Sequence, residues 1–70
     1  MKELWYAIVE ELNNLNVLET WCGNSNTAWG RAEEIEQHLK EQGNNIKLTV
    51  LGGWDNRYQM NEWFEKKQNR

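Results

Sequence analysis

The 70-residue sequence contains no proline, one cysteine (Cys22) and one histidine (His38). A single cysteine cannot form a disulfide within the chain, and it cannot complete a structural zinc site with one histidine. No run of 18 apolar residues is present, so we expect no membrane span, and early acidic residues argue against a signal peptide. We therefore expect a single domain, residues 1–70, in the cytoplasm, stabilised by packing or by a partner subunit.

Charge is modest and unevenly distributed along the chain. The 11 acidic and 8 basic side chains give a net charge of −3, with −5 in residues 1–36 and +2 in residues 37–70. An acidic chain of this kind is disfavoured for direct binding to nucleic acid. No nucleophile and base stand at a catalytic spacing, and His38 falls too far along its helix to reach Cys22. We expect no enzyme activity, no cofactor and no metal.

The first segment is predicted to be a helix over residues 3–14. At 100° per residue, its apolar side chains fall inside an arc of about 140°. These side chains are Leu4, Trp5, Ile8, Val9, Leu12 and Leu15. A strand is the alternative, because the run from Trp5 to Val9 is rich in aromatic and β-branched residues, but that strand would have no polar face.

The rest of the chain predicts two strands and two helices in alternation. The strands are expected at residues 17–22 and 46–51, and the helices at residues 27–42 and 56–67. Gly43 follows the first of these helices as a C-terminal stop, and Asp55 or its neighbour caps the second. The expected fold class is a small α/β domain ordered α-β-α-β-α around one right-handed βαβ unit.

The two loops that lead from strand to helix are the main candidate site. Ligands of open α/β sheets bind beyond the carboxyl ends of the strands, where helix N-termini attract anions. The candidate ligand-binding residues are Gly23, Asn24, Ser25, Asn26 and Thr27 in the first loop, and Gly53, Trp54, Asp55 and Arg57 in the second. Trp54 could stack on a flat ring, and Arg57 could pair with phosphate. The alternative is that these residues serve only as caps, turns and a lid over the core.

Part of this region resembles the first βαβ unit of flavodoxin-like proteins. The resemblance runs from Thr20 to Leu51, which is under half of the chain. Gly23-Asn24-Ser25 is similar to the phosphate loop of that family, and Ala32, Ile35, Leu39 and Gly43 are placed as in its first helix. The resemblance implies a phosphate-binding loop, although the remaining strands of that fold are absent.

The run Cys22-Gly23-Asn24-Ser25 also resembles the monothiol Cys-x-x-Ser arrangement of thioredoxin-like proteins. That resemblance implies a thiol of lowered pKa at a helix N-terminus. The chain has no proline to supply the cis-proline that such proteins place beside the cysteine. We therefore interpret Cys22 as a buried structural residue.

Two functions remain open at this point. The first is a small non-catalytic protein of phage or bacterial-conflict type that sequesters a phosphate-containing, nucleotide-like ligand at the two loops. The second is a protein-interaction inhibitor of anti-defence or anti-CRISPR type that blocks a host protein through an acidic or aromatic surface. The candidate partner-binding residues are Trp5, Glu33, Glu34, Glu36, Trp63 and Phe64. The small core also predicts a homo-oligomer, with Trp5, Trp63 and Phe64 at the subunit interface.

Overall fold

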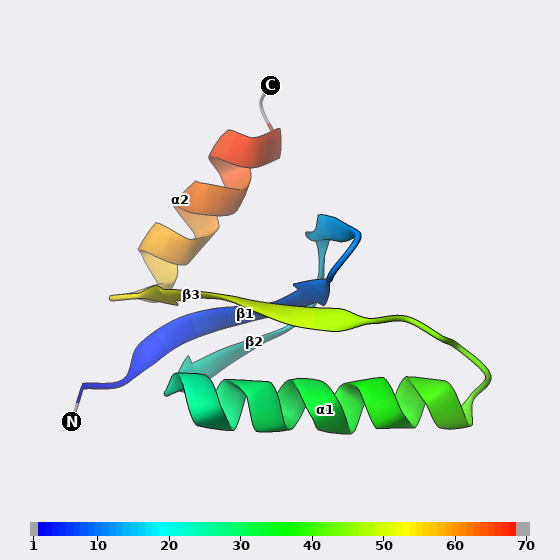
Figure 1. Cartoon of the computed structure of the whole chain (residues 1–70). Helices are drawn as coiled ribbons and strands as arrows, with labels where there is room; N and C mark the ends of the chain where they lie inside the picture. Colours follow the sequence, from blue (N-terminus) through cyan, green and yellow to red (C-terminus); the bar gives the residue numbers. More distant parts are fainter. Residues whose placement is uncertain (1, 69–70) are drawn as a thin grey trace.

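The computed structural model describes residues 2–68, which form a small mixed α/β domain (Figure 1). Three antiparallel strands form one sheet, and two helices pack on it. In chain order the elements are β1 (Leu4–Glu10), β2 (Asn13–Gly23), α1 (Ser25–Glu41), β3 (Leu48–Trp54) and α2 (Arg57–Gln68). The α/β class is therefore confirmed, whereas the predicted order, which began with a helix, is wrong. Neither helix of this part of the chain is long and apolar enough to cross a membrane.

Residues 3–14, predicted to be a helix, instead form β1, a turn at Glu11–Leu12 and the start of β2. The alternation of side chains along β1 explains the difference. Tyr6 and Ile8 point to one face of the sheet, and Ala7 and Val9 point to the other, yet all four are buried. A strand that is covered on both faces needs no polar face, so the lack of a polar face does not exclude a strand here.

The sheet order is β2-β1-β3, and β1 is antiparallel to both of its neighbours. It follows that β2 and β3 run in the same direction but are separated by β1. The connection through α1 therefore joins two strands of the same direction with β1 inserted between them, and the predicted right-handed βαβ unit is not confirmed. The sequence pattern predicts a helix in place of β1, which leaves no strand to lie between β2 and β3.

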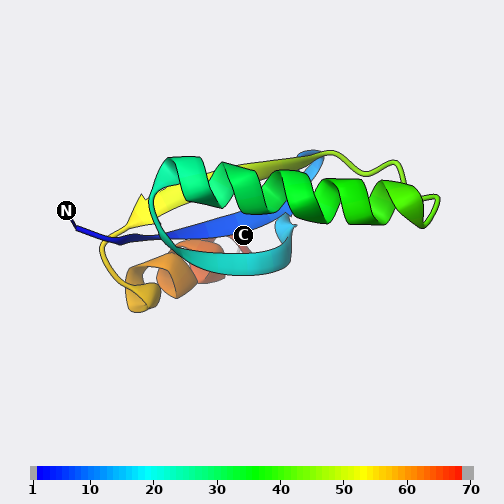
Figure 2. The ribbon, with the colours of Figure 1, turned by 90° about the horizontal axis from the view of Figure 1, so that it is seen from below.

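Each helix covers one face of the sheet: Figure 1 shows α1 below the strands and α2 above them, and in Figure 2, which is seen from below, α1 lies in front of the strands and α2 behind them. The core is accordingly divided into two clusters that share β1. Ile8, Ala32 and Leu48 form the cluster beneath α1. Ala7, Val9 and Met60 form the cluster beneath α2, with Trp5, Leu51, Trp54 and Phe64 packed around it.

The remaining element predictions agree with the structure to within a few residues. Helix α1 begins two residues before the predicted 27–42 and ends one residue before its last, α2 covers 56–67 apart from its first residue, and β2 contains the predicted 17–22. The strand predicted at 46–51 is shifted to β3. Gly43 follows the end of α1 with a φ of 88°, a left-handed conformation that glycine adopts without strain.

Candidate functional site

The two strand-to-helix connections lie at the same end of the sheet, as the sequence predicted. Gly23 at the end of β2 pairs with Leu4, and Trp54 at the end of β3 pairs with Trp5. The connections then diverge, because one leads to α1 on one face and the other leads to α2 on the opposite face (Figure 1). The first residues of β1 lie between them, so the two loops do not face each other directly.

The polar groups of the first loop are used to begin α1. Asn24 Oδ1 accepts from the Thr27 backbone nitrogen at 2.9 Å, and Thr27 Oγ1 accepts from the Asn24 backbone nitrogen at 3.2 Å. This reciprocal pair is a capping box. Thr27 Oγ1 also accepts from Trp21 Nε1 at 3.0 Å. Ser25 and Asn26, which are exposed, are the polar residues of this loop whose side chains take no part in the cap. Helix capping, the alternative to ligand binding, therefore accounts for most of this loop.

The polar groups of the second loop are likewise used in hydrogen bonds within the chain, most of them at the start of α2. Lys2 Nζ donates to Asp55 Oδ1 at 2.7 Å, and Asn56 Oδ1 accepts from the Gln59 backbone nitrogen at 2.9 Å. Gln59 Oε1 in turn accepts from the Asp55 backbone nitrogen at 3.3 Å. Asp55 and Asn56 thus serve the start of α2, and the predicted ligand role of Asp55 stays a prediction.

Gly53 has no room for a side chain. A Cβ atom there would lie 2.9 Å from Leu4 Cβ and 2.9 Å from Tyr6 Cζ, which is closer than side chains tolerate. The glycine is therefore explained by the close approach of β3 to β1, without a ligand.

Trp54 packs toward α2 and away from the first loop. Its ring centroid lies 5.6 Å from that of Trp63 and 6.0 Å from that of Phe64, and the latter two rings meet edge to face at 4.9 Å. Arg57 lies 6.0 Å from the centroid of the Trp5 ring, a cation–π distance. Trp5, Trp63 and Phe64, predicted at a subunit interface, thus pack within a single chain.

Beside this aromatic cluster lies a shallow hollow of about 310 Å³. It is lined by Trp54, Gln59, Glu62, Trp63 and Lys66. Lys66 Nζ is paired with Glu62 Oε1 at 3.2 Å, one turn earlier on α2. The hollow therefore combines two indole rings with an ammonium group that is paired to a carboxylate.

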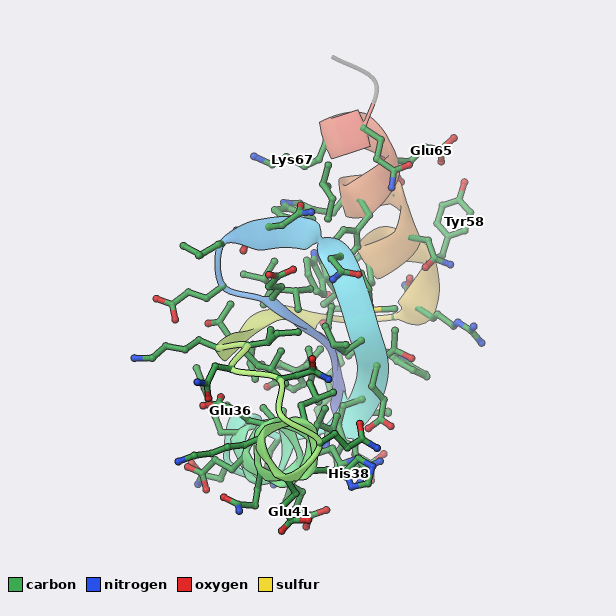
Figure 3. All side chains as sticks on the ribbon, turned by 90° about the vertical axis from the view of Figure 1, so that its right-hand side faces the viewer. Glu36, His38, Glu41, Tyr58, Glu65 and Lys67 are labelled. Carbon is green, nitrogen blue, oxygen red and sulfur yellow. The ribbon has the colours of Figure 1, made fainter. Side chains whose placement is uncertain are left out.

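The three glutamates of α1 predicted to bind a partner, Glu33, Glu34 and Glu36, do not form one surface. Glu34 Oε2 accepts from Arg31 Nη1 at 3.1 Å, whereas Glu36 Oε2 accepts from the Leu48 backbone nitrogen at 3.2 Å on the side of β3. Figure 3 shows Glu36 and His38 on opposite sides of α1, with Glu41 pointing away from the sheet. The predicted acidic face is thus divided, with Glu33 exposed and Glu36 partly buried.

Cys22 is exposed, so its interpretation as a buried structural residue is wrong. Its side chain points to the α2 face of the sheet at the edge strand, where α2 does not cover it. Reduced contact with water, and then the Glu3 carboxylate 3.6 Å away, raise the pKa of the Cys22 thiol. A raised pKa leaves less thiolate at neutral pH, the opposite of what the thioredoxin-like resemblance implies.

Apart from Trp29 on α1 and Tyr58 on α2, the large apolar side chains exposed within residues 2–68 lie in one segment. They are Leu12 (94% exposed), Leu15 (42%), Val17 (38%) and Leu18 (37%), all in the β1–β2 turn and the first half of β2. A helix over residues 3–14 would have buried Leu12 and Leu15 in a core-facing stripe. The exposure follows from the irregular first part of β2, where the register with β1 shifts on both sides of the Val9–Val17 pair and leaves Leu15 and Leu18 without partners on β1.

Beside β2 runs a second and larger hollow, of about 660 Å³, between this strand and α1. It is lined by Glu19, Thr20, Trp21, Thr27, Gly30, Arg31 and Glu34. Arg31 grips Glu19 through two hydrogen bonds of 2.6 and 3.0 Å, and this contact lowers the pKa of the Glu19 carboxyl. These bonds hold the Glu19 and Arg31 side chains in place within the hollow. Gly30, on the α1 side, has no side chain to fill it, and no atom lies within 4 Å of where its Cβ would be.

No protein-family model, no curated protein and no solved structure matches this chain. Within residues 2–68, no group of three or more acidic, histidine or cysteine side chains could hold a metal ion.

Proposed function

We propose that this protein is a non-catalytic, protein-binding protein that takes up an extended segment of another polypeptide along the outer edge of β2. One observation carries the proposal: β2 is an edge strand whose regular stretch, Glu19–Gly23, has a hollow beside it and whose irregular first part exposes aliphatic side chains. In strand addition, main-chain hydrogen bonds supply affinity, and pockets for alternate side chains supply specificity.

The direction of the free backbone groups on β2 follows from the register. The Glu11 backbone nitrogen donates to Lys47 O at 2.9 Å on the β3 side of β1. Backbone groups alternate along a strand, so those of Ala7 also point to β3, and those of Tyr6 and Ile8 point to β2. Thr20 pairs with Ala7, and its backbone N–H therefore points outward, as does that of Cys22 two residues later.

The proposal is tested with a library of random peptides selected for binding to the wild-type protein. Thr20→Pro removes an outward-pointing N–H, a change that an edge strand tolerates, and blocks an added strand. We expect enriched peptides to bind the wild type and to lose at least tenfold in affinity for the variant. Enrichment of peptides that bind both proteins equally, or no enrichment, contradicts the uptake of another polypeptide at this edge.

The matched control is Ser25→Pro, which also introduces a proline but lies away from the edge. Ser25 is the first residue of α1, a position that favours proline, and the preceding Asn24 has the extended backbone (φ −126°, ψ 171°) that a following proline requires. This variant is expected to bind the selected peptides as the wild type does.

A second candidate function is favoured by the hollow beside Trp54. Two indole rings and the ammonium group of Lys66 suit a flat, phosphate-bearing ligand of nucleotide type, and about 310 Å³ is at the lower limit for such sites. A nucleotide at 100 times its dissociation constant would stabilise the fold by about 2.7 kcal/mol. The absence of a thermal shift across a panel of nucleotides would remove this candidate.

A further inference from the structure

We infer that the segment which occupies the edge of β2 is the β2 strand of a second copy of this chain. The two copies would be related by a two-fold axis, so that two three-stranded sheets join into one antiparallel sheet of six strands. The inference rests on the proposed function, since both use the same edge, but it commits to a particular partner.

The exposed surface of the chain is larger than a compact monomer needs. Its accessible surface is 5183 Å², whereas a compact monomer of 8.4 kDa has about 4,600 Å². The difference, roughly 580 Å², is most of the ~800 Å² that one partner buries in an interface of standard size. The radius of gyration points the same way, at 12.4 Å against about 11 Å for a compact chain of this length.

The charges of β2 allow two copies to meet. Edge strands are commonly kept apart by lysine, proline, inward-pointing charges or β-bulges. The irregularities in the β1–β2 register all lie before Glu19, so the stretch that would pair is Glu19–Gly23. Between Asn13 and Gly23 the only charged residue is Glu19, and Arg31 of the same chain already neutralises it. Pairing two such strands therefore brings no unpaired like charges together.

The exposed aliphatic side chains supply the apolar contact. Leu15, Val17 and Leu18 stand within four residues of one another in the irregular part of β2, directly before the stretch that would pair. Because a two-fold axis presents the same patch from both copies, each set would be covered by its counterpart. At the other edge of the sheet, the Glu36 carboxylate already accepts from the Leu48 backbone nitrogen, so β3 is the less available of the two edges.

The test is the mass of the wild-type chain in solution, measured by sedimentation equilibrium from about 1 to 500 µM, a range that covers weak dimers. We expect the mass to approach twice 8.4 kDa at the upper end for the wild type and for Ser25→Pro. Thr20→Pro should remain a monomer with an unchanged circular dichroism spectrum. A wild type that stays monomeric throughout, or a Thr20→Pro variant that dimerises like the wild type, overturns the inference.

A second variant keeps the test decisive if Thr20→Pro does not fold. Thr20→Lys places a charge at the edge without altering the backbone, and Asn61→Lys adds the same charge on the exposed surface of α2. Thr20→Lys should lower the association constant of the dimer at least tenfold, and Asn61→Lys should leave it unchanged.

Hydrogen exchange separates this inference from the proposed function. In a β2-paired dimer, the amides of Thr20 and Cys22 exchange more slowly as the protein concentration rises. A monomer that still binds selected peptides at this edge would refute the dimer and leave the proposed function standing. A dimer for which no peptide is selected would support the pairing of two copies and refute the uptake of other polypeptides at this edge.

Discussion

At the scale of single residues, Trp54 has the most consequential placement. It closes the aromatic cluster beneath α2, with ring contacts to Trp63 and Phe64. We expect Trp54→Ala to lower the free energy of unfolding by about 2–4 kcal/mol, somewhat less than a fully buried tryptophan because the ring is only partly covered. Urea unfolding followed by circular dichroism measures the change.

The control for this substitution is Tyr58→Ala, on the same helix. Tyr58 is 77% exposed, and Figure 3 shows it pointing outward from α2. Its removal should change stability by less than about 0.5 kcal/mol. Equal unfolding curves for the two variants would show that Trp54 does not contribute to the core.

Only part of the residue-level site could be predicted from the sequence. The presence of helix caps near Asn24 and Asn56 could be predicted from the sequence, because a cap is set by a few neighbouring residues. The direction of the Trp54 and Cys22 side chains was not, because it depends on the register of each strand in the sheet. A shift of one residue moves every side chain of a strand to the other face.

At the scale of elements, α1 was predicted correctly because its signals are local in the sequence. The prediction of a helix in place of β1 was wrong because the structure of β1 depends on strands that are distant in the sequence. Helix α1 has one buried stripe and clear signals at both ends, so its periodicity is visible in the sequence. In contrast, β1 is buried on both faces and reads as an unbroken apolar run from Trp5 to Val9. Such a run also fits one face of a helix, so periodicity cannot distinguish the two.

The capping box of α1 gives a prediction at this scale. Asn24→Ala removes the side chain that accepts from the Thr27 backbone nitrogen, and we expect a loss of about 1 kcal/mol in stability. Asn26→Ala is the matched control, because Asn26 is exposed within the same turn and caps nothing. Thermal unfolding of both variants tests the difference, and an equal loss in the two would show that the box does not stabilise the helix.

At the scale of the whole molecule, β1 is the element that joins two separate cores. Ile8 belongs to the cluster beneath α1, and Ala7 and Val9 belong to the cluster beneath α2. This arrangement could not be predicted once β1 was taken for a helix, because the order β2-β1-β3 requires contacts between residues that are distant in the chain. It also implies that neither face can lose its packing without loosening the strand on which the other depends.

Met60→Ala tests this coupling between the two faces. Met60 is 1% exposed beneath α2, and its truncation should cost about 2–5 kcal/mol. A domain of this length has a stability of about 4–10 kcal/mol, so the loss is a large share of the total. Because β1 is common to both cores, the amides of α1 should lose as much protection from hydrogen exchange as those of α2. Asn61→Ala, exposed beside Met60, should leave both helices unchanged. If α1 kept its protection in Met60→Ala while α2 lost it, the two faces would unfold independently, and β1 would not couple them.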